Sequence, residues 1–99
     1  MHVIVWEFEP KAGKEPEFLR AYGPGGDWAW LFARSPEYRG IELLRPHQSG
    51  ERRYLTIDHW TSAGAYDAFR ERWHEEYEAL DKRCEGLTER ETLIGRFDS

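Results

Sequence analysis

The chain has 99 residues and a formal net charge of −5, with 14 Lys and Arg against 19 Asp and Glu. This length fits one domain over residues 1–99, and basic side chains interleave with acidic ones, which argues against nucleic acid or an anionic membrane surface as the main partner. A single cysteine, Cys84, excludes a disulfide framework or a Cys-based metal site within one chain.

Targeting signals and membrane spans are not evident in the sequence. No apolar run approaches the roughly 18 residues of a membrane span, and the N-terminus lacks the charged and apolar regions of a signal peptide. We therefore expect a cytoplasmic protein. Five Trp, five Tyr and five Phe are many for this length. They indicate a large core, a ligand pocket or a subunit interface.

The first third of the chain predicts one strand and two short helices. Val3–Phe8 is β-branched and aromatic, and it is apolar on both faces until Glu7, which is typical of a strand covered on two sides. A helix is expected over Lys14–Tyr22. After the break at Gly23–Gly26, Asp27 is expected to be the N-cap of a second helix, Trp28–Arg34.

The rest of the chain predicts a β-hairpin, a long helical region and a last strand. Tyr38–Arg45 and Arg53–Trp60 flank a five-residue turn and should pair. Thr61 or Ser62 should cap a helical region over Ser62–Cys84, with room for a kink near Trp73–Glu75. Its apolar stripe follows helical spacing: Tyr66, Phe69, Trp73, Tyr77, Leu80 and Cys84. Leu87–Phe97 is the last strand.

The predicted order is β, α (split), β, β, α, β, which is an α+β, ferredoxin-like split βαβ fold with a four-stranded antiparallel sheet. Helices on one face leave the other face bare. Because Leu55 and Ile57 are apolar on one side of their strand and Tyr54 and Trp60 on the other, the bare face is also apolar. We expect it to be a docking surface for a second copy, giving a homodimer in which two sheets face each other.

The phrase YLTIDHWTSAGAYDAF at 54–69, the opening strand and the last strand of about ten residues resemble the antibiotic biosynthesis monooxygenase domain, of the dimeric α+β barrel superfamily. The resemblance implies a dimer, a pocket between sheet and helices, and activities that include cofactor-independent oxygenation of aromatic polyketides and haem degradation. The haem-degrading members use an Asn on the first strand and a Trp on the helix. Here the first strand has no Asn, and Phe69 occupies the Trp position.

Three residues are the candidates for catalysis. Trp73 and Tyr77 lie one turn apart on the apolar face, where indole N–H and phenol O–H groups could orient an electron-rich aromatic substrate. His59 shares a strand face with Leu55 and would be the general base if that face lines the pocket. Asp58 points the other way and is expected to pair with an Arg. The alternative for all three candidates is a structural role in the core or interface.

The expected function is oxidation or binding of an aromatic small molecule, without a metal or other cofactor. No two His residues show metal-ligand spacing, and Gly23–Gly26 lacks the context of a phosphate-binding loop. The alternatives are a non-catalytic, small-molecule-binding or stress-related dimer of the same fold, and a haem-binding or haem-degrading member. Four further aromatic residues are expected to contact the substrate: Trp6, Trp28, Tyr66 and Phe69.

Overall fold

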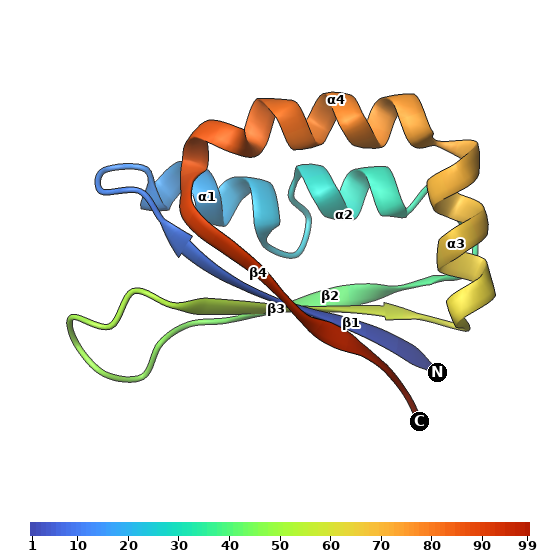
Figure 1. The fold of residues 1–99 in the computed structure, drawn as a ribbon, viewed down its shortest axis with the longest axis horizontal. Helices are drawn as coiled ribbons and strands as arrows, with labels where there is room; N and C mark the ends of the chain where they lie inside the picture. Colours follow the sequence, from blue (N-terminus) through green and yellow to red (C-terminus); the bar gives the residue numbers. More distant parts are fainter.

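The computed structural model describes all residues, 1–99, as a four-stranded antiparallel sheet with its helices on one side (Figure 1). The predicted ferredoxin-like α+β fold is confirmed. The strands lie in the order β2-β3-β1-β4. Their bounds are His2–Pro10 (β1), Tyr38–Leu44 (β2), Tyr54–Trp60 (β3) and Thr88–Asp98 (β4).

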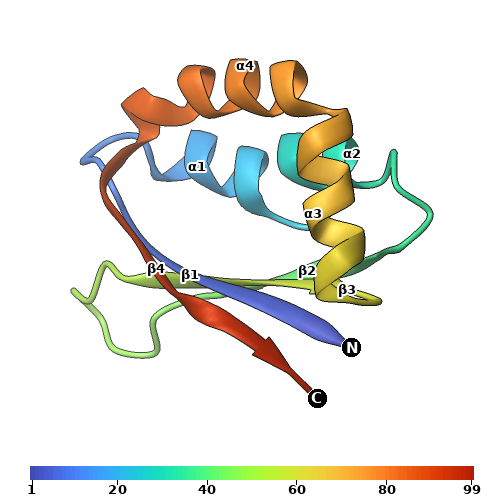
Figure 2. The ribbon, with the colours of Figure 1, turned by 45° about the vertical axis from the view of Figure 1, so that its right-hand side comes forward.

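The helices are α1 (Glu15–Tyr22), α2 (Asp27–Phe32), α3 (Ala63–Arg72) and α4 (His74–Cys84), and a single 3₁₀ turn, Glu85–Leu87, leads into β4. All four lie on the same side of the sheet in two views (Figures 1 and 2). None of them is long and apolar enough to cross a membrane.

The long helical region bends at Trp73, where the backbone leaves helical geometry (φ −108°, ψ 30°). As a result α3 and α4 run in different directions (Figure 2). The sequence allowed for a kink here, and the structure shows two separate helices. Ser62 is the predicted N-cap of α3, and its hydroxyl accepts a hydrogen bond from the Ala65 N–H at 3.1 Å.

The start of α2 differs from the sequence prediction. Asp27 lies inside the helix, and Gly26 is the N-cap. A Cβ added at Gly26 would lie 2.2 Å from the Arg20 carbonyl oxygen, so only glycine permits this close approach of two backbone segments. Asp27 instead places its negative charge in the first turn, where the helix dipole favours it.

Strand alternation places the core between the sheet and the helices. In β3, Tyr54, Thr56, Asp58 and Trp60 are buried under the helices, while the residues between them are half-buried on the opposite face. Most of the core residues are aromatic, and their rings pack at centroid distances near 5 Å, stacked for Phe18 with Tyr22 and edge-on for Phe32 with Trp60. Not all of the space in this layer is filled.

Candidate functional site

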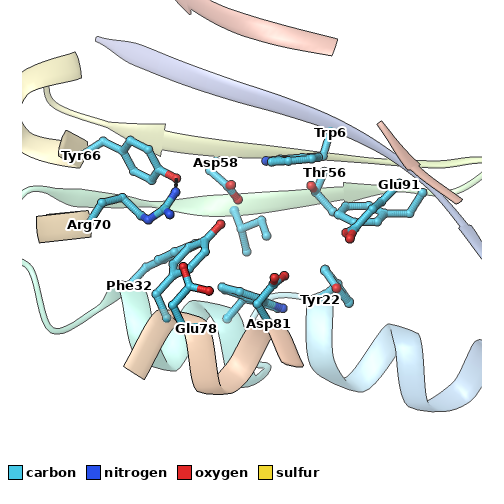
Figure 3. Close-up of a pocket in the computed structure, with 14 residues that line it drawn as sticks. Trp6, Tyr22, Phe32, Thr56, Asp58, Tyr66, Arg70, Glu78, Asp81 and Glu91 are labelled. Carbon is cyan, nitrogen blue, oxygen red and sulfur yellow. Dashed lines mark hydrogen bonds between the residues drawn. The ribbon is translucent and has the colours of Figure 1, made fainter. Parts of the chain in front are cut away.

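A cavity of about 300 Å³ lies between the helix-facing side of the sheet and the helices. Its volume is at the lower end of the range of small-molecule sites, roughly 300–1,000 Å³. The cavity has two kinds of lining. The apolar wall consists of Trp6, Phe8, Tyr22, Trp28, Phe32 and Ile41. The polar side chains are Thr56, Asp58, Tyr66, Arg70, Tyr77, Glu78, Asp81 and Glu91. Figure 3 shows both sets converging from the sheet and the helices.

Asp58 is the most unusual group in this cavity. Its residue is 6% exposed, and its Oδ1 atom has no hydrogen-bond partner. Burial raises the pKa of this carboxyl from 3.8 to about 7, because the charged form loses its hydration. A carboxyl with a pKa near neutrality can take a proton from a ligand and give it back, so Asp58 has the properties of a general base.

Arg70 is the only cation among the lining residues. Its Nη1 donates a hydrogen bond to the Tyr66 hydroxyl at 3.1 Å, and its guanidinium carbon lies 3.7 Å from the centroid of the Tyr77 ring. Its buried Nε has no acceptor. This N–H and the hydroxyl hydrogen of Tyr66 are therefore donors that can meet a negatively charged ligand oxygen.

Tyr77 lines the same cavity, next to Arg70. Burial raises the pKa of its phenol above the ordinary value of 10.0, so the group stays protonated at neutral pH. The Trp28 ring packs edge-on against it at a centroid distance of 5.0 Å, and the indole Nε1 of Trp28 is buried without an acceptor. Tyr77 and Trp28 thus supply an aromatic wall that also carries polar hydrogens.

The structure brings four of the seven sequence-predicted site residues to the cavity: Trp6, Trp28, Tyr66 and Tyr77. Phe69 is buried behind the wall, against Phe32 and Trp60. Trp73 is also outside the lining. It sits at the bend between α3 and α4, where its ring faces the guanidinium groups of Arg34 and Arg72.

His59 lies on the opposite face of the sheet from the cavity. Its Nε2 is 2.7 Å from Oε1 of Glu42, on the neighbouring strand. Its prediction as the base depended on that face lining the pocket, and the structure places the pocket behind the other face. The expected Arg partner of Asp58 was wrong, since Asp58 makes no ion pair and its Oδ1 has no partner.

Sequence reasoning therefore missed all the polar lining residues except Tyr66 and Tyr77, namely Thr56, Asp58, Arg70, Glu78, Asp81 and Glu91. The sequence did contain a signal for Asp58. By strand alternation it shares a face with Tyr54, Thr56 and Trp60, and an acidic residue on a largely aromatic face is unusual. No three His, Cys, Asp or Glu side chains converge so that they could hold a metal ion.

A family model for the antibiotic biosynthesis monooxygenase domain matches residues 1–79. No curated protein sequence matches the chain significantly. SnoaB, a cofactor-independent oxygenase from Streptomyces nogalater, has the same fold at 22% identity and a TM-score of 0.71, over 99% of this chain and 91% of SnoaB.

Two further solved structures share the fold over nearly the whole chain. The haem degrader MhuD from Mycobacterium tuberculosis, solved with two haems in its active site, is 27% identical, with a TM-score of 0.68 over 100% of this chain and 95% of MhuD. A putative antibiotic biosynthesis monooxygenase from Bordetella bronchiseptica is 17% identical, with a TM-score of 0.74 over 99% and 95%. Since the family model covers most of the residues and these structures share its fold, the chain belongs to the antibiotic biosynthesis monooxygenase family.

Proposed function

We propose that this protein is a cofactor-independent monooxygenase that oxidises an aromatic small molecule in the cavity between sheet and helices. The observation that carries the proposal is Asp58, a buried carboxyl with a free oxygen inside an aromatic cavity and a pKa of about 7. The family membership and the likeness to SnoaB, described as a cofactor-independent oxygenase, support the reaction class.

The chemistry follows from what oxygen requires. Ground-state O₂ accepts electrons one at a time, so a reaction without metal or flavin needs an electron-rich substrate anion. Asp58 takes a proton from an acidic C–H next to the ring, and the oxygen that gains negative charge is met by the N–H of Arg70 and the hydroxyl of Tyr66. The anion then reduces O₂, and the two combine as a peroxide.

The peroxide loses water to leave a carbonyl group. For a ring methylene the balance is R₂CH₂ + O₂ → R₂C=O + H₂O. One oxygen atom enters the product, the other leaves as water with the two hydrogens of the methylene, and Asp58 gives back its proton to the departing oxygen. The aromatic wall, with Trp6 and Phe8 from β1 and Trp28 from α2, keeps bulk water from the anion.

The test is oxygen uptake with anthrone-type and quinol-type substrates. Asp58→Asn removes the base and keeps the shape, so kcat should fall by about 10²–10⁴-fold. Asp27→Asn is the matched control, because it makes the same chemical change on the exposed start of α2, outside the cavity. No uptake by the natural protein, or full activity in Asp58→Asn, would contradict the proposal. Ligand binding without uptake would identify a non-catalytic binding protein instead.

We also propose that the open face of the sheet pairs with a second copy of this chain. Large apolar side chains remain exposed there and near it: Leu44 is 43% exposed, Ile94 50% and Phe97 50%. The charged groups on this face are of both signs, as in the Glu7–Arg53 and Glu42–His59 pairs, so two identical faces do not repel each other.

The assembly can be tested by sedimentation. Phe97→Glu replaces one of the exposed apolar side chains of the proposed contact, on the edge strand β4, with a charge and should yield a single-subunit species. Trp30→Glu is the control, since Trp30 is 76% exposed on α2, on the far side of the molecule. If the natural protein already sediments as one subunit, the homodimer is excluded. If both variants behave alike, the open face is not its contact.

A further inference from the structure

We propose that the natural ligand of the cavity is an aromatic compound that carries a basic amino group, held by the carboxylates at the cavity's rim. The inference rests on the proposed function, since it concerns the same cavity and names its substrate class. Three acidic residues line the rim in addition to the internal Asp58: Glu78 and Asp81 from α4, and Glu91 from β4. Figure 3 shows them around the same space as Trp6 and Thr56.

These carboxylates have no partner within the protein. None of the ion pairs in the structure includes Glu78, Asp81 or Glu91. By contrast, Glu76 on the same helix pairs with Arg34 at 3.8 Å. The acidic groups are also close enough to raise one another's pKa values. Burial, and then the charges of Glu78 and Glu85, raise the pKa of Asp81, while burial and the charge of Asp81 raise the pKa of Glu91.

A second, independent observation points to a ligand. Asp58 is almost fully buried in the same cavity, and its Oδ1 lacks a partner. A buried polar atom without a hydrogen bond destabilises the folded state, so such a group is retained where something else supplies the bond. The indole Nε1 of Trp28 is in the same state on the apolar wall. The cavity thus has both an unfilled polar centre and an unpaired acidic rim.

The charge balance selects the ligand. Four carboxyl groups face one guanidinium, that of Arg70, whose Nη1 donates to the Tyr66 hydroxyl and whose guanidinium carbon lies 3.7 Å from the centroid of the Tyr77 ring. A ligand carboxylate at the rim would meet three carboxylates against the single guanidinium of Arg70, whereas an ammonium group would be attracted by three carboxylates that have no ion-pair partner. Because no three of the acidic side chains converge on a metal site, an organic cation with an aromatic body suits the arrangement.

Three probes with one ring system test the charge preference. Dopamine, 4-ethylcatechol and 3-(3,4-dihydroxyphenyl)propanoate share a catechol and a short arm, which ends in an ammonium, a methyl and a carboxylate group. Anaerobic calorimetry at low salt should give binding affinities that decrease in that order. The amine should bind about tenfold more tightly than 4-ethylcatechol, as expected for partly exposed charge pairs. Added salt should shrink the difference.

The double variant Asp81→Asn, Glu91→Gln should reduce the amine preference to less than about threefold. The matched control, Glu75→Gln with Glu89→Gln, makes the same charge change on the same helix and strand outside the cavity lining, and should keep the preference. Equal binding of amine and carboxylate, a preference that survives the double variant, or no measurable binding of the amine would each overturn the inference.

Oxygen uptake separates this inference from the proposed function. If the amine binds preferentially but no aromatic compound is oxidised, the ligand class holds and the oxygenase does not. If neutral substrates are oxidised and the amine has no advantage in binding, the oxygenase holds and the ligand class does not.

Discussion

Two buried ionisable side chains lie on the helix-facing side of neighbouring strands, and they differ in hydrogen bonding. His2 on β1 is 3% exposed, and both ring nitrogens are bonded, Nδ1 to Asp98 at 2.6 Å and Nε2 to Arg96 at 3.0 Å. Asp58 on β3 is 6% exposed and has an oxygen with no bond at all.

His2, Asp98, Arg96 and Asp67 form a hydrogen-bonded cluster, the His2 cluster. Because an arginine can only donate, Nε2 of His2 must accept, so the ring is neutral with its hydrogen on Nδ1, which donates to Asp98. Arg96 is in turn held by Asp67 at 3.0 Å and stacks over the Tyr66 ring. All polar atoms of the histidine are satisfied, as expected for a group that serves folding. The contrast indicates that burial alone does not mark a functional group, whereas a buried carboxyl with an unpartnered oxygen inside a cavity is a candidate for one.

The difference between Asp58 and His2 predicts that the free energy of unfolding depends on pH through Asp58. The folded-state pKa of Asp58, about 7, lies above its unfolded value near 3.8. The folded protein therefore binds more protons in this range. The contribution of Asp58 is fully present below pH 4 and is lost as pH rises through about 7. Relative to Asp58→Asn, the natural protein should lose about 2–3 kcal/mol of unfolding free energy between pH 5 and pH 8.

Urea unfolding at both pH values and one protein concentration measures this difference, with Asp27→Asn as the control that should follow the natural protein. Parallel pH profiles for the natural protein and Asp58→Asn would mean that Asp58 titrates as an ordinary carboxyl and that its oxygen is solvated. The comparison with His2 would then lose its basis.

The second test disrupts the His2 cluster. His2→Ala takes away two side-chain hydrogen bonds and leaves a void beside Trp60, so the free energy of unfolding should fall by about 2 kcal/mol. His2→Asn keeps an N–H near the position of Nδ1 and should recover part of the loss. Oxygen uptake per folded molecule should be unchanged in both variants. An unchanged stability in His2→Ala would show that the cluster is not structural.

The sequence predicted the elements and the aromatic part of the site, because these depend on local pattern. Tyr66 and Tyr77 belong to the helical stripe, and both reach the cavity. The remaining groups depend on tertiary placement. Asp58 could be identified only by knowing which sheet face the helices cover, and its neighbours Leu55 and Ile57 made the opposite face equally apolar.

The bend at Trp73 also limited what could be predicted about the site from the sequence. Read as one continuous helix, the stripe placed Trp73 beside Tyr77 on the substrate side, and Arg70 was not part of it. In the structure the chain changes direction at Trp73, between α3 and α4. Trp73 therefore faces Arg34, and the guanidinium carbon of Arg70 lies 3.7 Å from the centroid of the Tyr77 ring. Such a change depends on packing against the sheet and has no signature as strong as a proline.

The smallest expected effect concerns His59, the base that strand alternation first suggested. His59 is half-buried on the open face and pairs with Glu42, whose side chain is 55% exposed. Such a pair contributes about 0–1 kcal/mol, and the sheet separates it from the cavity. His59→Gln should therefore change kcat/KM by less than about threefold, against the large loss in Asp58→Asn. If the two variants lose activity equally, proton transfer involves the open face, and the second copy that we place there would contribute to the active site.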